Sequence, residues 1–418
     1  YPVEIYIRAY DRSGLLRDVS QLLANEKINV GFIGIGGRGA ANLGSMVRLG
    51  ENVVALCDVD DARAGKAYQR YPKARKFKDF RRMYDAIAKQ IDAVVISTPD
   101  HTHFHPAMAA LQLGKHLYCE KPMAQSLEQA NAMILFHEQF GTTLMVGESY
   151  VFHHPIVAAR TAIENGDIGE VLHIRETKGP WMMRREEASR LDGLSHEASA
   201  PWRVDPALSG GGRFPWIMDH APHFFATARY LASGAEVTAI TAHSQIGTTA
   251  SEQVSGTGAP TGQAITSVAW SFEGGIDSAW NQVESSQEAV SEVGFVTTVH
   301  GTKGTLVVYG EGGGAAPGMR QPPAVVLYRD GHTRVIDREN TTDRVWISNN
   351  NYYDSSHQAA LQHWVDSILT GNPVRYSGED GRSELAATLA TIMSADEQRT
   401  IAPADVPAEW KAYHASER

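Results

Sequence analysis

Three side chains of the sequence have the chemical types needed to move a proton near neutral pH: Lys121, Asp219 and His223. Removing the proton of a hydroxyl group requires a base such as histidine. Asp219 and His223 are four residues apart, so a helix would carry both on one face. The residues alone leave simpler interpretations open: a solvated lysine, Asp219 as the N-cap of a helix with Pro222 in its first turn, and His223 as a core histidine.

A glycine-rich turn near residue 34 is expected to position these residues. The apolar run Val30–Ile33 leads into the turn, and a helical pattern follows it. In a dinucleotide-binding turn, Gly34 would permit the tight bend, Gly36 would let the backbone approach a pyrophosphate, and Gly39 would let helix and strand pack closely. The phosphates would lie on the N–H groups of the helix N-terminus. Ordinary turns also contain such glycines, so the motif alone does not decide. The residues assigned to the turn are Gly34, Ile35, Gly36, Gly37, Arg38 and Gly39.

Asp58 strengthens the dinucleotide interpretation. It ends the second predicted strand, Asn52–Asp58, about 20 residues past the glycines, where a carboxylate accepts hydrogen bonds from both ribose hydroxyls and repels a 2′-phosphate. The alternative is a turn-forming aspartate before Asp60 and Asp61. Arg38 could instead receive a 2′-phosphate, so the sequence favours NAD and leaves NADP open.

The chain then alternates strands and helices, which predicts a parallel sheet with helical crossovers. The later strands are expected at 92–98, His116–Cys119 and Thr142–Gly147, with a helix over Ser126–Phe140. Ligands of such sheets bind beyond the carboxyl ends of the strands. We therefore expect the cofactor to contact Ser97, Thr98, Pro99, His103, Glu120 and Lys121. The alternating His101, His103 and His105 lack an accompanying ligand set, so capping, packing or cofactor contact is favoured and no metal site is predicted.

Composition narrows the class of protein. The 418 residues are 43% hydrophobic, ordinary for globular domains, and the net charge of −10 without a basic run argues against nucleic acid or an anionic membrane as partner. No apolar segment approaches the length that spans a bilayer, and the first residues lack the pattern of a signal peptide. Cys57 and Cys119 lie in predicted buried strands, which favours core packing and a reducing, cytoplasmic location.

Residues 1–29 precede the glycine motif and follow a different pattern. Val3–Ala9 alternates like a strand, and an amphipathic helix ends near Glu26. The runs 9–16 and 24–30 resemble the first strand and helix of an ACT regulatory domain, but they cover less than half of such a domain. A packed appendage or a fused segment is therefore expected rather than a working sensor.

Taken together, the motifs resemble the Gfo/Idh/MocA oxidoreductases, which include glucose–fructose oxidoreductase and inositol dehydrogenase. The likeness rests on the glycine turn, Asp58, Thr98–His103 and above all Glu120-Lys121-Pro122. It covers roughly residues 30–405. Its further motifs are 168–171, 210–212, the pair Asp219 and His223, 300–305 and 376–382.

The resemblance implies an α/β fold with two domains. A Rossmann domain would occupy residues 30–150, and an α+β substrate domain with an open, mostly antiparallel sheet would occupy 151–418, its exposed sheet face forming a homodimer or homotetramer. The local pattern agrees, with loops at 244–263 and 310–323 and helices at 356–370 and 381–397. The strands expected in the second domain are Val171–Thr177, Val237–Ser244, Ala264–Trp270, Val296–Val299 and Ala324–Tyr328.

The resemblance also assigns roles. The matching histidine, His223, would act as acid and base, Lys121 would stabilise the developing alkoxide, and Asp219 would help hold the substrate hydroxyl. Val151 stands where the family often has arginine or methionine, which leaves the substrate's identity open. The expected substrate contacts are Tyr150, Phe152, His153, Trp202, Arg203 and Tyr353.

The resulting hypothesis is an NAD(P)-dependent oxidoreductase that transfers hydride between nicotinamide and a hydroxyl carbon of a sugar, glycoside or cyclitol. Two alternatives stay open. One is a redox-type glycosidase whose NAD is reduced only transiently, and the other is a sensor of nucleotides or metabolites without catalysis.

Overall fold

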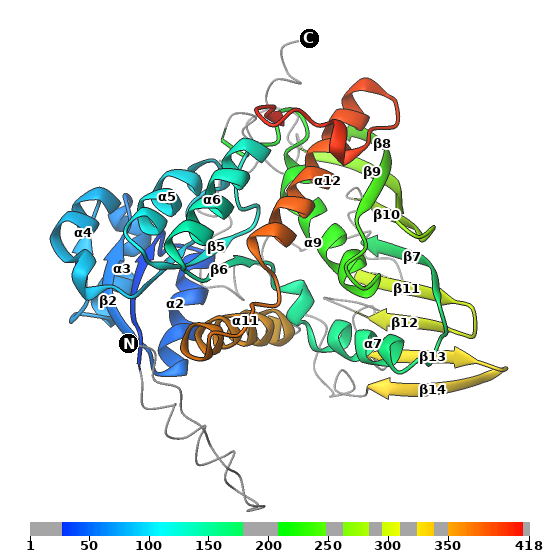
Figure 1. Cartoon of the computed structure of the whole chain (residues 1–418), viewed down its shortest axis with the longest axis horizontal. Coiled ribbons are helices and arrows are strands. Elements are labelled where there is room, and N and C mark those ends of the chain that lie inside the picture. The colour runs from blue at the N-terminus through cyan, green and yellow to red at the C-terminus, as the bar shows by residue number, and fades with distance from the viewer. Residues whose placement is uncertain are drawn as a thin grey trace, which may run out of the picture.

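The computed structural model describes residues 27–178, 208–247, 262–283, 295–309, 324–337 and 350–412. These residues form two sheets, each with helices packed against it (Figure 1). The expected α/β fold, with a Rossmann sheet followed by a mostly antiparallel sheet, is confirmed. The ACT-like segment, Trp202 and Arg203 lie outside the described residues.

The first sheet is parallel throughout, in the order β3-β2-β1-β4-β5-β6. This is the doubly wound order of dinucleotide-binding folds. The strands β1 and β4 are buried on both faces, which explains their continuous apolar sequence. Only the short β3, with exposed Arg75 and Lys76, lacked an apolar signal. The strands are β1 (Asn29–Ile33), β2 (Asn52–Cys57), β3 (Arg75–Phe77), β4 (Ala93–Ile96), β5 (His116–Glu120) and β6 (Leu144–Gly147).

Five helices connect these strands: α2 (Arg38–Leu49), α3 (Asp61–Arg70), α4 (Phe80–Ile87), α5 (Phe104–Gln112) and α6 (Leu127–Phe140). Three of them, α3, α4 and α6, begin after a side-chain cap, since Asp60, Asp79 and Ser126 each accept a backbone N–H of the first turn. The helix α2 has no such cap, and Gly37 precedes it. Its first turn has no side-chain acceptor, and the N–H groups of Gly39 and Ala40 donate to the backbone carbonyl oxygens of Gly36 and Gly37.

The second sheet has the order β14-β13-β12-β11-β7-β10-β9-β8, and only β7 and β10 run parallel. All five predicted strands are present, whereas β10, β12 and β14 were not predicted. The loop expected from Ser244 begins later, because β8 continues to Gly247. The strands are β7 (Val171–Lys178), β8 (Val237–Gly247), β9 (Gly262–Phe272), β10 (Asp277–Val283), β11 (Phe295–Gly301), β12 (Thr305–Tyr309), β13 (Val325–Arg329) and β14 (His332–Asp337).

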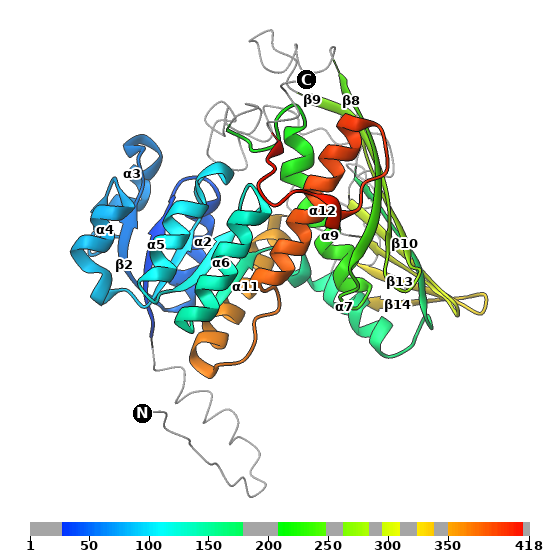
Figure 2. The same ribbon diagram turned by 45° about the horizontal axis from the view of Figure 1, so that its top comes forward.

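Helices cover one face of the second sheet and leave the other face bare in the described part of the chain (Figure 2). The covering helices are α7 (His154–Glu164), α9 (Pro215–Leu231) and α12 (Gly378–Glu397). On the covered face Phe224 stacks on Trp280 at 4.2 Å between ring centroids, and Phe225 meets Trp270 edge-on. Burial of these rings fixes α9 against the sheet.

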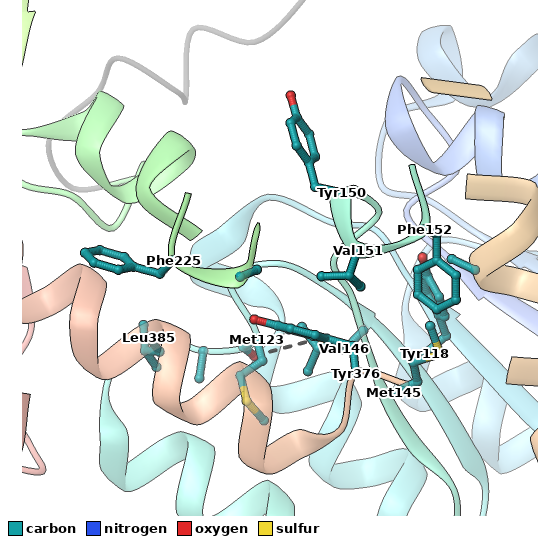
Figure 3. Close-up of a cluster of buried hydrophobic side chains, with 14 of the residues drawn as sticks. Tyr118, Met123, Met145, Val146, Tyr150, Val151, Phe152, Phe225, Tyr376 and Leu385 are labelled. Atoms are coloured by element: carbon teal, nitrogen blue, oxygen red, sulfur yellow. Dashed lines mark hydrogen bonds between the residues drawn. The ribbon is translucent and has the colours of Figure 1, made fainter. Parts of the chain in front are cut away.

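The last part of the chain returns to the first sheet. The helix α11 (Asn350–Thr370) packs against α2, and its Trp364 meets Tyr118 of β5 edge-on. Tyr376, just before α12, lies beside Val146 of β6, whose N–H donates to the Tyr376 carbonyl oxygen at 3.2 Å (Figure 3). The two sheets thus share one apolar core. None of the described helices has the length and apolar character of a membrane span.

Two glycines of the first turn are sterically required. Gly34 has φ 80°, and a Cβ there would lie 2.6 Å from the carbonyl oxygen of Ser97. A Cβ on Gly39 would lie 1.9 Å from the carbonyl oxygen of Gly34. These contacts agree with the predicted tight bend and close packing of helix and strand.

We expect Gly39→Ala to destabilise the protein by about 2–3 kcal/mol, because the added methyl group collides with backbone. Gly44→Ala in the same helix is the matched control, since its nearest neighbour would be the Arg48 guanidinium at 3.6 Å. The Gly44→Ala variant should gain about 0.5–1 kcal/mol in the free energy of unfolding. Chemical denaturation of both variants checks this, and equal stability of the two would contradict the steric argument.

Candidate active site

The carboxyl ends of β1, β4, β5 and β6 meet at one edge of the first sheet, and α9 from the second domain closes this edge. The glycine turn follows β1, Ser97 follows β4, Lys121 follows β5 and Glu148 follows β6. In doubly wound sheets this edge is where ligands bind. The site is thus built from residues far apart in sequence.

The glycine turn fits a dinucleotide. A Cβ on Gly37 would meet no atom within 4 Å, so this part of the turn leaves room for a phosphate beside the first N–H groups of α2. Asp58 lies next to the turn, where its carboxylate accepts the N–H of Ile35 at 2.9 Å and that of Asp60 at 3.0 Å. These bonds hold an acceptor group where the ribose of a bound dinucleotide is expected.

Asn42 of α2 links the turn to the neighbouring strand ends, a role that was not predicted. Its buried side-chain amide donates to Glu120 at 2.6 Å and to Ser97 Oγ at 3.1 Å. Burial raises the pKa of Glu120, while Arg38, the Asn42 bond and Lys121 favour its charged form.

His103 is fully buried and holds the backbone around Lys121. Its ring nitrogens lie 2.8 Å from the carbonyl oxygens of Pro122 and Thr98. The peptide bond between Lys121 and Pro122 is cis. Burial lowers the pKa of His103, which favours the neutral ring. A neutral ring carries one N–H, so it can donate to only one of these two carbonyl oxygens. The described residues contain no group of three or more histidine, cysteine, aspartate or glutamate side chains arranged to hold a metal ion.

Lys121 and Asp219 form a buried ion pair between the two domains. Lys121 Nζ lies 2.9 Å from Asp219 Oδ1 and 2.7 Å from the Asp219 carbonyl oxygen, and the two side chains are 13% and 10% exposed. The helix α9 starts at Pro215 and includes Pro222 in its interior, so Asp219 is not an N-cap. The solvated-lysine interpretation is likewise wrong.

His223 pairs with Glu148, which sequence reasoning missed. His223 Nδ1 lies 2.9 Å from Oε1 and 2.8 Å from Oε2 of Glu148, and the Glu148 side chain is completely buried. Burial raises the pKa of Glu148 to about 7, against the N–H of Tyr150 and the charge of Lys121, which lower it. The available signal was a charged residue directly after an apolar strand. The same position had drawn attention to Lys121.

Among the predicted substrate contacts, Tyr150 and His153 lie beside His223. The Tyr150 ring stacks between them, at 4.2 Å from the His223 centroid and 4.5 Å from that of His153. Phe152 instead packs under the Arg375 guanidinium, and its ring leaves the segment in a different direction from that of Tyr150 (Figure 3). The structure therefore does not bring Phe152 to this group. Tyr353 belongs to α11, but its side chain lies outside the described residues.

His220 extends the site toward the second sheet. Its Nδ1 lies 2.9 Å from the side-chain amide of Gln282, its Nε2 lies 3.6 Å from Asp219 Oδ2, and its ring stacks on Trp216. Burial, reinforced by the charge of Lys178, lowers the pKa of His220 well below its usual range. A neutral, oriented ring therefore lies beside the ion pair of Lys121 and Asp219.

Two family models match this chain. Residues 28–148 match the oxidoreductase family with an NAD-binding Rossmann fold, and residues 156–307 match the GFO/IDH/MocA C-terminal domain. The matches span both sheets and include Lys121, Glu148, Asp219 and His223.

Individual relatives agree with this placement. The chain is 24% identical over 375 residues to the myo-inositol 2-dehydrogenase of Thermotoga maritima, covering 90% of this chain and 98% of that protein. It is 30% identical over 164 residues to the 2,7-anhydro-N-acetylneuraminate hydratase of Escherichia coli, covering 39% of this chain and 42% of that protein. The solved levoglucosan dehydrogenase in complex with NADH and L-sorbose shares the fold, with a TM-score of 0.71, 23% identity and coverage of 91% and 99%.

Proposed function

Since the chain belongs to the Gfo/Idh/MocA oxidoreductases, whose first domain binds NAD, we propose that it is an NAD-dependent dehydrogenase of a sugar, glycoside or cyclitol. One observation carries the proposal: Lys121, held by Asp219, and His223, held by Glu148, lie together where the strands end beside the glycine turn. A relative over nearly its whole length is a myo-inositol 2-dehydrogenase, which supports the substrate class.

The side chains supply the proton chemistry of such an oxidation. NAD, when bound, accepts the hydride that leaves the hydroxyl carbon. His223 takes the hydroxyl proton, and its pairing with Glu148 stabilises the imidazolium that forms. The Lys121 ammonium stabilises negative charge on the substrate oxygen as the proton leaves, and Asp219 fixes that ammonium. The products are a carbonyl compound, NADH and one proton on His223.

Asp58 supports NAD rather than NADP as the cofactor. Its carboxylate lies at the end of β2 beside the glycine turn, and a negative charge there repels a 2′-phosphate. This arrangement favours two ribose hydroxyls over a phosphate.

A reaction without net oxidation is the second candidate. The relative with 30% identity over 164 residues is a hydratase, and a hydratase adds water without consuming NAD. Transient oxidation at one carbon, followed by return of the hydride, would use the same lysine and histidine. A pure sensor would not require a buried lysine and histidine, each held by a carboxylate.

We also propose that the bare face of the second sheet joins copies of this chain. Side chains on that face include exposed Ile265, Ala269 and Tyr328, and Ala269 lies on β9, which pairs with β8 and β10. Apolar groups on an uncovered sheet are typical of an interface. A homodimer or homotetramer would cover them.

The two cysteines support a reducing, cytoplasmic location. Cys57 and Cys119 are both buried free thiols in strands of the first sheet, as expected of core residues. Burial raises the pKa of Cys57 to about 12, so it stays protonated. Both thiols are buried and free, so the structure contains no disulfide between them that an oxidising compartment would have to form.

The activity is tested with NAD⁺ and a panel of inositols, hexoses and glycosides, following NADH absorbance and the products by NMR. On the preferred substrate, Lys121→Ala and His223→Asn should each lower kcat by about 10²–10⁴-fold. The exposed Lys89 and His332 provide matched controls, Lys89→Ala and His332→Asn. Full activity of the first pair would overturn the site assignment, and product formation without NADH would favour transient oxidation.

Asp58→Asn tests the cofactor preference. The amide keeps an oxygen that can accept the Ile35 N–H but removes the charge, so the ratio of kcat/KM for NAD⁺ over NADP⁺ should fall by about tenfold or more. Asp61→Asn is the control, because Asp61 is exposed and pairs with Lys78. An unchanged ratio in Asp58→Asn would show that Asp58 does not select the cofactor.

Light scattering coupled to gel filtration tests the assembly. Ala269→Glu would place a charge on the bare face and should reduce the mass from that of an oligomer toward the monomer. Ala62→Glu, at an exposed position of α3, should leave the mass unchanged. A wild-type monomer, or an oligomer that Ala269→Glu does not affect, would contradict an interface on this face.

A further inference from the structure

Glu148 makes two kinds of contact at the end of β6. Both of its oxygens lie within hydrogen-bond distance of His223 Nδ1, and Oε1 also accepts the backbone N–H of Tyr150 at 2.8 Å. The backbone bond fixes the carboxylate to the main chain at the sheet edge. His223 is thus oriented by a group on another domain, because Glu148 ends the first sheet and His223 lies on α9.

We propose that Glu148 is the positioning residue of His223: it accepts the Nδ1–H and thereby makes Nε2 the nitrogen that takes the hydroxyl proton. The inference rests on the proposed function, in which His223 is the base. A neutral imidazole carries one N–H, and the hydrogen bond that it makes selects the tautomer. A carboxylate is an acceptor only, so it selects the form with hydrogen on Nδ1.

A second buried acid lies behind Glu148. Glu384 of α12 is buried and accepts the hydroxyl hydrogen of Tyr376 at 2.6 Å. Burial and the neighbouring Glu148 raise the pKa of Glu384 well above its usual range, and the same two causes act on Tyr376, together with Glu384. Glu384 is thus engaged by the Tyr376 hydroxyl, whereas Glu148 accepts the Tyr150 N–H and faces His223.

The charge on Glu148 matters most after the proton arrives. As the substrate O–H bond breaks, its proton bonds to Nε2, while the carbon–hydrogen electron pair leaves as hydride. The ring then carries a positive charge, which Glu148 stabilises across a 2.8 Å contact. In the described part of the chain, the titratable groups around this pair are Glu120, Lys121, Tyr150, His153, Asp219, His220, Tyr376 and Glu384.

Glu148→Gln separates charge from geometry. A glutamine Oε1 can accept both the Tyr150 N–H and the Nδ1–H, as Glu148 Oε1 does, so orientation is kept and the charge is lost. We expect kcat for the oxidation to fall by about 10²-fold or more with little change in KM. Without the anion the imidazolium is less stable, so the acidic limb of the kcat/KM profile should move to lower pH by about one unit.

The control is Glu51→Gln. Glu51 accepts the backbone N–H of Ile28 at 2.7 Å and precedes β2, at the edge of the sheet opposite the site. It should leave kcat and the pH profile unchanged. Wild-type kcat and pH profile in Glu148→Gln, with Glu51→Gln also normal, would overturn the positioning role and leave Glu148 a packing residue.

A second measurement does not depend on turnover. In protein with ¹⁵N-labelled histidine, the His223 ring signals are identified by their loss in His223→Asn, and long-range ¹H–¹⁵N spectra report the tautomer. We expect the Nδ1–H form in the wild type and in Glu148→Gln, and a shift toward Nε2–H in Glu148→Leu. An Nε2–H ring in the wild type refutes the inference whatever the reaction is. Full activity of His223→Asn with the expected tautomer refutes only the proposed function.

Discussion

The buried ion pair of Lys121 and Asp219 is the contact on which the site depends. It joins the end of β5 to α9 across the two domains, with both side chains largely removed from water. A buried pair recovers through its own attraction about what it loses in hydration, so it adds little to stability by itself. Its effect is geometric, because removing either partner would leave a buried charge without its counterion. The pair thus fixes the distance between the first domain and the helix that carries His223, the proposed base.

The opposite face of α9 packs against the second sheet, and this packing holds the helix in the position that the ion pair requires. Phe224 and Phe225 bury their rings against Trp280 and Trp270 of the second sheet. Asp219 and His223 are four residues apart and lie on one face of the helix. With Phe224 and Phe225 packed against the second sheet, that face is turned toward the first domain. Pro222 lacks the N–H that would donate to the Met218 carbonyl within this helix, and the carbonyl oxygen of the next residue, Asp219, accepts from Lys121 Nζ. Packing on one face therefore positions charge on the other.

Much of this arrangement was predictable from local sequence. At Gly34 and Gly39, backbone atoms occupy the space that a side chain would need, so only glycine fits. The two glycines can therefore be recognised in the sequence by their spacing. Lys121 was found from its place after an apolar strand. Phe152 lies apart from the Tyr150 and His153 rings because Tyr150–Phe152 forms a 3₁₀ turn, in which residues three apart align and those two apart diverge. That geometry stacks Tyr150 on His153 and turns Phe152 away.

Glu148 and Asn42 were missed because their roles depend on partners distant in sequence. Asn42 donates to Glu120, and Glu148 holds His223, contacts that no local pattern encodes. Both nevertheless follow from one electrostatic requirement. A buried carboxylate is tolerated only with donors around it, so Glu120 needs Asn42, and Glu148 needs the Tyr150 N–H and a histidine. Each acid at the sheet edge thus implies a donor nearby, and where that donor is a histidine on another helix, the same bond that satisfies the acid orients a base.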